Sequence, residues 1–410
     1  MDANTSQATF SLSIRAGFPD FLDLPWDLPV SEWEGVNSRL EEVERGLSRH
    51  PVVFVNYDGN LYAIKELPPL VAEQEYDNLV RINELHLPAV TPVGYARTWA
   101  GDRNASVLIT SFLDRSLPYR SLFMHTNLER YREHLLDAMA GLLVQLHLSG
   151  IFWGDCSLSN TLFLRDAGAL EAYLVDAETV EVYPRLVSPT LRYQDLEIMG
   201  ENVNGELMDL RTQGQLSNMA SGVPILDTGA YIRLRYQALW EEITREVLIR
   251  PEENYRIQER IRALNALGFS VGEVRLTGGE SGNLLRLGVV VTDRNFHRDQ
   301  LQGLTGLDVQ EMQARQMMNE IHELQALLSQ TSGRSTPLSV ASYQWLEHFY
   351  KPTIDQLKPL LDDQADPAEL YCQVLEHKWY LSEQAGRDVG HQATINDFLN
   401  RFGDRDAPSG

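Results

Sequence analysis

The sequence has few cysteines, few basic residues and no long hydrophobic run, and each shortage excludes a class of protein. Only Cys156 and Cys372 occur in 410 residues, too few and too far apart for a disulfide framework or a zinc-binding CxxC pair. No apolar run approaches the roughly twenty residues that a helix needs to cross a bilayer. The segment Met1 to Phe10 also lacks the basic and apolar parts of a signal peptide. We therefore expect a cytoplasmic protein without a transmembrane segment.

The charge balance is strongly acidic. Thirty-five Lys and Arg residues stand against fifty-eight Asp and Glu residues, which leaves a formal net charge of −23. Such a surface repels a phosphate backbone, so nucleic acid is not an expected partner. A few basic side chains in a pocket are still enough to bind a small polyphosphate. The ten histidines show no HExxH or comparable metal-binding spacing.

Pattern and turn residues divide the chain into three predicted parts. Glycine, serine, asparagine and proline cluster between 213 and 224, which indicates a boundary there. We predict an α+β protein: a strand-rich part (1–112), a mostly helical part (113–225), and an α-rich part with one small β-hairpin (226–410). The expected strands are 9–15, 52–55, 61–65, 93–99, 107–112, 161–164, 172–175, 271–276 and 284–291.

Helices are predicted from apolar spacing and from capping residues. The apolar positions between Val71 and Leu85 recur at helical spacing. Ser31 with Glu34 forms a capping box and predicts a helix through about Leu47. Thr126 with Glu129 predicts another to about Leu148, with an apolar stripe on one face formed by Leu128, Tyr131, Leu135, Met139, Leu142 and Leu146. Asp58-Gly59 and the segment 166–168 indicate tight turns between strands.

The pattern that points to chemistry is the segment from Trp153 to Asn160, WGDCSLSN, followed beyond a predicted hairpin by Val175-Asp176. Asp155 and Asn160 have the D-x-x-x-x-N spacing of a kinase catalytic loop. Phosphoryl transfer needs a carboxylate to orient the acceptor hydroxyl and an oxygen ligand to hold magnesium beside the phosphates. Asp155 suits the first role, and Asn160 with Asp176 suits the second.

A lysine and a glutamate upstream complete this set. Lys65 ends the predicted strand of Ala63-Ile64-Lys65, and we expect it to neutralise the α- and β-phosphates of ATP if a helical glutamate holds its amine. Glu75 is the favoured partner, because it shares a helix face with apolar residues and an isolated charge there is costly. Glu73 lies on a more polar face and is the weaker choice.

These residues resemble the protein-kinase-like superfamily and, more closely, its lipopolysaccharide kinase (Kdo/heptose kinase) branch, in which His-Gly-Asp replaces His-Arg-Asp. The resemblance covers about 52–182. It implies a bilobal fold with an N-lobe (1–112) and a C-lobe (113–225), ATP and Mg²⁺ as cofactors, and transfer of phosphate to an unidentified hydroxyl acceptor such as a sugar or a protein. The segments 376–383 and 386–390 resemble an actinobacterial domain of unknown function, which implies a bacterial source.

Departures from the family pattern keep two alternatives open. Trp153 replaces the histidine, Ser157 stands where many kinases have Lys or His, Asp176-Ala177-Glu178 replaces Asp-Phe-Gly, and no glycine-rich lid precedes Lys65. A pseudokinase that binds nucleotide without turnover fits these changes. An interaction protein without any nucleotide role is the second alternative.

Three other features receive weaker interpretations. Cys156 has no histidine near it in sequence, so a thiol nucleophile is not favoured. The glycine-rich segment 278–282 lacks the Lys-Ser/Thr ending of a P-loop and is expected to join two strands. Trp379, Tyr380 and Arg387 are consistent with a surface that docks a protein partner or the kinase part, and equally with ordinary helix packing.

Overall fold

The computed structural model describes residues 9–43, 49–100, 103–124, 128–216, 219–220, 222–245, 247–249, 273–278, 285–290, 296–361 and 365–402. The chain divides into two compact units. The first contains Met1–Leu164 and Leu170–Ala238, and the second contains Arg165–Ala169 and Leu239–Gly410. The predicted division into three parts stays a prediction.

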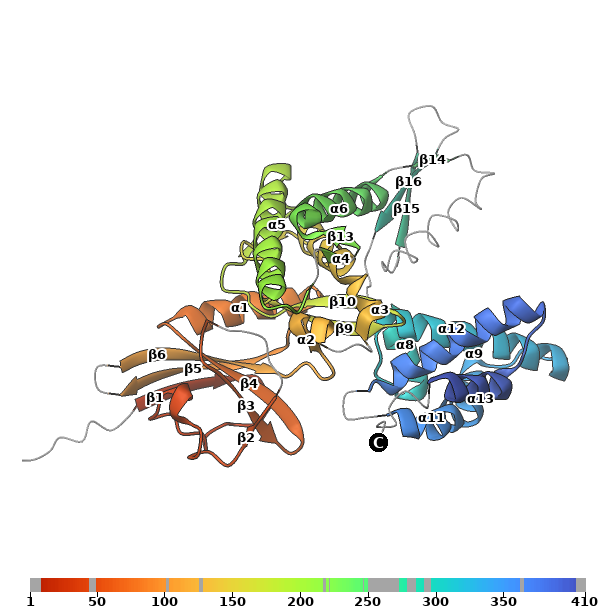
Figure 1. Ribbon diagram of the computed structural model, residues 1–410, viewed down its shortest axis with the longest axis horizontal. Coiled ribbons are helices and arrows are strands. Elements are labelled where there is room, and N and C mark those ends of the chain that lie inside the picture. Colours follow the sequence, from red (N-terminus) through yellow and green to blue (C-terminus); the bar gives the residue numbers. More distant parts are fainter. Residues whose placement is uncertain are drawn as a thin grey trace, which may run out of the picture. The chain divides into compact units, whose positions relative to one another are not determined.

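The first unit begins with a six-stranded sheet in the order β1-β5-β6-β4-β3-β2, coloured red to orange in Figure 1. Neighbouring strands are antiparallel. The turn between β3 and β4 has positive φ at Asp58 and Gly59, 54° and 85°, as a tight hairpin requires, so the predicted turn is confirmed. The strands are β1 (Thr9–Ile14), β2 (Leu40–Glu41), β3 (Val52–Tyr57), β4 (Asn60–Leu67), β5 (Pro92–Ala100) and β6 (Arg103–Ser111).

Helix α1 (Val71–Glu84), which the apolar spacing predicts, follows β4 and packs against β5 and β6. The helix predicted from Ser31 to Leu47 is wrong. The chain there forms one 3₁₀ turn, η1 (Val30–Glu32), and then β2, which pairs with β3. Two features oppose a helix: Gly35 takes a left-handed φ of 77°, and Trp33 is fully buried with its indole N–H donated to the carbonyl oxygen of Leu28.

The following segment is mostly helical. The single helix predicted up to Leu148 is divided into α3 and α4, and residues 125–127 lie outside the described ranges. The predicted apolar stripe is confirmed, since Leu135, Met139, Leu142 and Leu146 of α4 are buried. The helices are α2 (Tyr119–Met124), α3 (Glu129–Arg132), α4 (Leu135–Leu148), α5 (Pro189–Thr212) and α6 (Thr228–Thr244), with the 3₁₀ turn η3 (Ile225–Asp227) before α6.

Short strands support the loop between α4 and α5. The β9–β10 hairpin turns at Ala167 and Gly168, both with positive φ (53° and 85°), which confirms the predicted turn. At its open end the N–H of Val175 donates to the carbonyl oxygen of Asn160 over 3.1 Å, so the residues before β9 and after β10 lie side by side. The strands are β7 (Leu117–Pro118), β8 (Ile151–Phe152), β9 (Thr161–Asp166), β10 (Ala169–Leu174), β11 (Glu181–Val182), β12 (Met219–Ala220) and β13 (Val223–Pro224).

The second unit is α-rich with a small sheet, as expected. The two long strands predicted there are confirmed as the antiparallel pair β15 (Glu273–Gly278) and β16 (Leu285–Val290), with β14 (Val247–Ile249) beside β16. Of the predicted glycine-rich loop, 279–282 lies outside the described residues. The helices are α8 (Phe296–Thr305), α9 (Glu311–Ser332), α10 (Leu338–Trp345), the π-helical turn η4 (Leu346–Tyr350), α11 (Lys351–Leu357), the 3₁₀ turn η5 (Lys358–Leu360), α12 (Pro367–Ala385) and α13 (His391–Phe402).

Residues 165–169, at the tip of the β9–β10 hairpin, are an integral part of this second unit. The buried carboxylate of Asp166 accepts the N–H groups of Met312 and Gln313 in the first turn of α9, at 3.1 and 2.8 Å. The buried carboxylate of Glu369 in turn accepts the N–H groups of Ala167 and Gly168, at 2.7 and 2.8 Å. Each carboxylate satisfies backbone donors that would otherwise be buried without partners.

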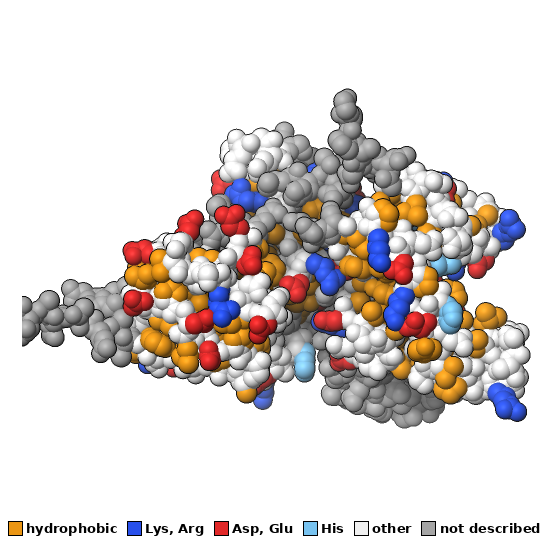
Figure 2. All heavy atoms as spheres, turned by 90° about the horizontal axis from the view of Figure 1, so that it is seen from below, with side chains coloured by type: hydrophobic (Ala, Val, Ile, Leu, Met, Phe, Trp, Pro, Cys, Tyr) orange, Lys and Arg blue, Asp and Glu red, His pale blue; other side chains and the backbone are white. Residues whose placement is uncertain are grey.

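Within the described ranges, no helix combines the length and the apolar character that crossing a membrane requires. Acidic, basic and apolar side chains are interspersed on the face shown in Figure 2. Trp379 and Tyr380 are 65% and 45% exposed, so these two aromatic residues of α12 are not covered by helix packing within the described part of the chain.

Candidate functional site

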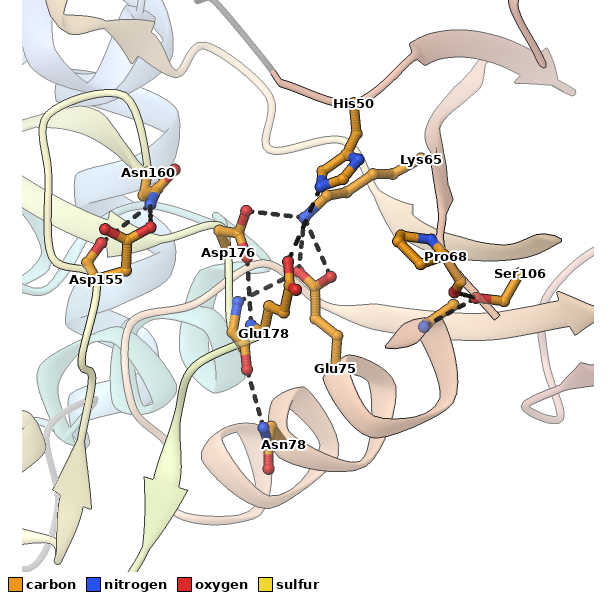
Figure 3. A network of polar contacts seen from close by, with 12 residues as sticks. His50, Lys65, Pro68, Glu75, Asn78, Ser106, Asp155, Asn160, Asp176 and Glu178 are labelled. Carbon is orange, nitrogen blue, oxygen red and sulfur yellow. Dashed lines mark hydrogen bonds and ion pairs between the residues drawn. The ribbon is translucent and has the colours of Figure 1, made fainter. Parts of the chain in front are cut away.

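The amine of Lys65 lies between two carboxylates (Figure 3). Its Nζ is 3.1 Å from both oxygens of Glu75 and 2.9 Å from Oδ2 of Asp176. The three residues come from β4, from α1 and from the segment after β10, and are 10 and 111 positions apart in sequence. Glu73 instead pairs with Arg97. The structure thus brings together three of the five residues predicted for the site.

Burial of this ion-pair network acts against the charged forms of Lys65 and Glu75. Glu75 is fully buried, and burial raises its pKa to about 7 against the opposing effect of Lys65. For Lys65, burial acts to lower the pKa, but the adjacent carboxylates of Glu75 and Asp176 hold the pKa above its ordinary value. A second donor, the N–H of Ala177, lies 3.2 Å from Oε1 of Glu75. The pair is satisfied internally, as buried charges must be.

The other two predicted residues form a second contact in the loop between β8 and β9 (Figure 3). Nδ2 of Asn160 donates to the backbone oxygen of Asp155 over 3.0 Å and to its Oδ2 over 3.2 Å. These bonds occupy the amide nitrogen of Asn160 and leave its Oδ1 as the atom available to a cation. Asp155 keeps its carboxylate at the same cavity that Lys65 and Asp176 line.

Trp153 supports the loop between β8 and β9. Its fully buried indole donates to the carbonyl oxygen of Asp176 over 2.9 Å, and its own carbonyl oxygen accepts the hydroxyl of Thr179 over 2.7 Å. The loop and the segment after β10 are therefore bonded to each other through Trp153.

The neighbouring Cys156 is fully buried, and burial raises the pKa of its thiol. A thiol with a raised pKa is unsuited to act as a nucleophile.

Helix α5 carries three polar residues that sequence reasoning missed. Asp195 accepts the N–H groups of Trp153 and Gly154 at 2.8 and 2.9 Å. Glu206 accepts the N–H groups of Leu158 and Ser159 at 2.7 and 3.0 Å. Between them, Asn202 donates to Oδ1 of Asp155 over 3.2 Å. These three residues are seven and four positions apart, which puts them on one helix face. This spacing was the sequence pattern that could have indicated them.

Buried polar groups also anchor this helix. His147 of α4 is fully buried and contacts Oδ2 of Asp195 through Nε2 over 3.0 Å and the hydroxyl of Tyr236 through Nδ1 over 2.8 Å. Burial lowers the pKa of His147 despite the carboxylate beside it. This histidine therefore packs in the core, and its ring links α4 to α5 and α6.

A cavity of about 860 Å³ joins the two groups of residues within the first unit. Sheet residues such as Val52, Ala63 and Leu108 provide apolar walls, and Asp155, Asn160 and Asp176 line the other side. Its size lies within the range of pockets that enclose small ligands and cofactors. Arg49 and His50, in the segment before β3, also line it. Residues 44–48 lie outside the described ranges.

Comparisons with known proteins agree with the resemblance noted in the sequence. Residues 56–215 match the lipopolysaccharide kinase (Kdo/WaaP) family, and residues 238–402 match DUF4032, a domain of unknown function. No curated protein matches the chain. A solved structure titled "WaaP in complex with acyl carrier protein" is similar at 16% identity, covers 63% of this chain and 99% of that chain, and has a TM-score of 0.34. Two successive segments of the chain, each shorter than half of its length, are thus similar to the Kdo/WaaP kinase family and to DUF4032.

Proposed function

We propose that this protein is an ATP- and Mg²⁺-dependent phosphotransferase that acts on a hydroxyl group. The observation that carries the proposal is the network of Lys65, Glu75 and Asp176, which lines the same cavity as Asp155 and Asn160. A lysine held by a helical glutamate, a loop aspartate with an asparagine five residues later, and a second aspartate after a hairpin are the parts that phosphoryl transfer uses in kinases.

The residues fit a nucleotide with magnesium. Nζ of Lys65 is the cationic group that would contact the α- and β-phosphates. Asp176 and Oδ1 of Asn160 supply two hard oxygen ligands, the type that Mg²⁺ prefers. Among the described residues no group of three or more His, Cys, Asp or Glu is placed to hold a metal, so the phosphates and water would complete the coordination. Bound Mg²⁺ would neutralise charge on the β- and γ-phosphates.

Asp155 has the remaining role. Its carboxylate would accept a hydrogen bond from the acceptor hydroxyl and orient the oxygen toward the γ-phosphorus. As the new oxygen–phosphorus bond forms, the bond to the β-phosphate oxygen breaks, ADP leaves, and the hydroxyl proton passes to Asp155. The acceptor is not specified by these residues; the family description suggests a sugar, and a protein side chain would undergo the same chemistry.

The test compares single substitutions in the full chain. The protein is incubated with γ-labelled ATP and Mg²⁺ in a bacterial extract, and labelled products are identified. We expect Asp155→Asn to abolish transfer while the thermal shift caused by MgATP remains, and Asp176→Asn to lose both. Asp58→Asn, at an exposed turn with positive φ, is the control. Equal labelling by wild type and Asp155→Asn would refute the proposal.

A pseudokinase is the second candidate, and one contact favours it. The hydroxyl of Ser157 accepts the N–H of Asn160 over 3.1 Å, so the position where many kinases carry a cation toward the transferred phosphate has an inward-facing structural role here. Tight MgATP binding without any turnover or labelled product would favour this alternative. Absence of a Mg²⁺-dependent thermal shift with ATP would instead indicate a protein without a nucleotide role.

A further inference from the structure

Asn202 of α5 contacts the carboxylate of Asp155 from the side opposite to Asn160. Its Nδ2 donates to Oδ1 of Asp155 over 3.2 Å and to the carbonyl oxygen of Cys156 over 3.0 Å. Asn160 donates to the other oxygen, Oδ2, over 3.2 Å. Each oxygen of the carboxylate thus receives one amide N–H, so rotation of the Asp155 side chain breaks a bond on either side.

The chemistry of Asn202 is that of a donor. Its amide nitrogen has two hydrogens, and two acceptors, a carboxylate and a backbone carbonyl, face it. The reversed amide would place Oδ1 against both acceptors, which is repulsive. A neutral donor is therefore required, and an aspartate of the same shape would set two negative charges against each other.

Asn202 also lies on α5 between two residues that bind the backbone of the loop. Seven residues before it, Asp195 binds the backbone N–H groups at the start of the loop, and four residues after it, Glu206 binds those near its end. Both contacts are to backbone, so the loop has a defined place against the helix whatever side chains it carries. A group on such a helix orients its partner more accurately than one on a loop.

We propose that Asn202 is a positioning residue that fixes the orientation of the Asp155 carboxylate toward the acceptor hydroxyl. The inference rests on the proposed phosphotransfer. Both hydrogen bonds of the Asn202 amide among the described residues go to the loop, at Asp155 and Cys156, so its effect falls on transfer and leaves the nucleotide phosphates with their own partners. Asp155 without this donor adopts further rotamers, most of which point its oxygens away from the acceptor.

The kinetic test uses Asn202→Asp, Asn202→Leu and a matched control, Asn204→Asp, which adds the same charge to the same helix. Asn204 accepts the hydroxyl of Thr228 through Oδ1, a role that aspartate retains. We expect kcat for MgATP turnover to fall about 10- to 100-fold in both Asn202 variants, with KM for ATP within about twofold. Asn202→Asp should be at least as impaired as Asn202→Leu, whereas a residue that only fills space would tolerate the isosteric aspartate better.

A second measurement needs no activity. Asn202→Asp should lower the melting temperature of the first unit by about 2 to 4 °C, and adding Asp155→Asn should recover part of this loss, because the exchanged pair again has one donor and one acceptor while the carbonyl oxygen of Cys156 still faces an acceptor. Non-additive recovery in this double-mutant cycle reports the contact itself. The inference would be overturned if the changes in melting temperature of the two single variants simply added in the double variant. It would also be overturned if the kcat of Asn202→Asp equalled that of Asn204→Asp. If the wild-type protein shows no MgATP turnover, the proposed function is refuted, and with it any catalytic effect of Asn202. The double-mutant cycle would still measure the contact between Asn202 and Asp155.

Discussion

The buried carboxylate of Glu75 makes the stability of the first unit depend on pH in a defined direction. Its pKa in the folded protein is about 7, against an ordinary value of 4.5, because burial penalises the charged form. Between these two values the folded state binds a proton that the unfolded state has released. Stability from this group is therefore fully present below about pH 4.5 and is lost as pH rises toward 7.

The magnitude follows from the size of the pKa difference. Each unit of pKa corresponds to about 1.4 kcal/mol, so the loss between pH 5 and pH 7.5 is about 2 to 3 kcal/mol. Glu75 is fully buried, so solvent screening does not reduce this effect as it would at the surface. Glu75→Gln keeps the shape of the side chain and removes the titration.

The assay is urea unfolding of wild type and Glu75→Gln at intervals from pH 5 to 7.5, with the free energy of unfolding taken for the transition that the substitution affects. The difference, wild type minus variant, should fall by about 2 to 3 kcal/mol across this range. Glu84→Gln, which removes an exposed carboxylate of the same helix, is the matched control. A difference that stays constant or increases with pH would show that Glu75 is ionised throughout and refute the reasoning.

Two further substitutions test contacts outside the ion-pair network. Trp153→Phe removes the indole N–H donated to the Asp176 carbonyl. It should lower the free energy of unfolding by about 1 to 3 kcal/mol and weaken MgATP binding, and thermal shifts without and with MgATP measure both effects. The control Trp99→Phe, at an exposed position, should change neither, and equal behaviour of the two variants would contradict the supporting role of Trp153. Glu369→Gln replaces a buried acceptor of two backbone N–H groups and should lower the melting temperature of the second unit, measured by calorimetry. The control Glu383→Gln, at an exposed position, should leave it unchanged. An unchanged transition in Glu369→Gln would show that the carboxylate of Glu369 is dispensable.

Local chemistry explains why much of the fold could be predicted. The Asp58-Gly59 and Ala167-Gly168 turns depend on backbone conformations that neighbouring residues decide, and the apolar stripe of α4 depends only on helical spacing. The helix expected after Ser31 failed for a non-local reason. Its capping box is a valid local pattern, but burial of Trp33 in the core beneath the sheet outweighs the propensity of the segment.

Some residues of the candidate site could likewise be predicted from the sequence, and others could not. Lys65, Asp155, Asn160 and Asp176 could be proposed because their spacing and order along the chain are those of a known catalytic arrangement. Glu75 could be preferred over Glu73 from its helix face. The spacing of Asp195, Asn202 and Glu206 places them on one helix face but did not by itself indicate a role, because a polar residue on a helix acquires one only when a particular loop is placed against it.

The sequence by itself determined the short-range features: the acidic surface, the turns, the helical stripes and the spacing of the residues proposed for phosphotransfer. Only the tertiary structure decided that the amine of Lys65 lies within 3.1 Å of Glu75 and 2.9 Å of Asp176, that Trp153 bonds to Asp176, and that α5 binds the loop at both ends. These contacts join residues far apart in the chain, and their distances result from the packing of whole strands and helices, which no local pattern encodes.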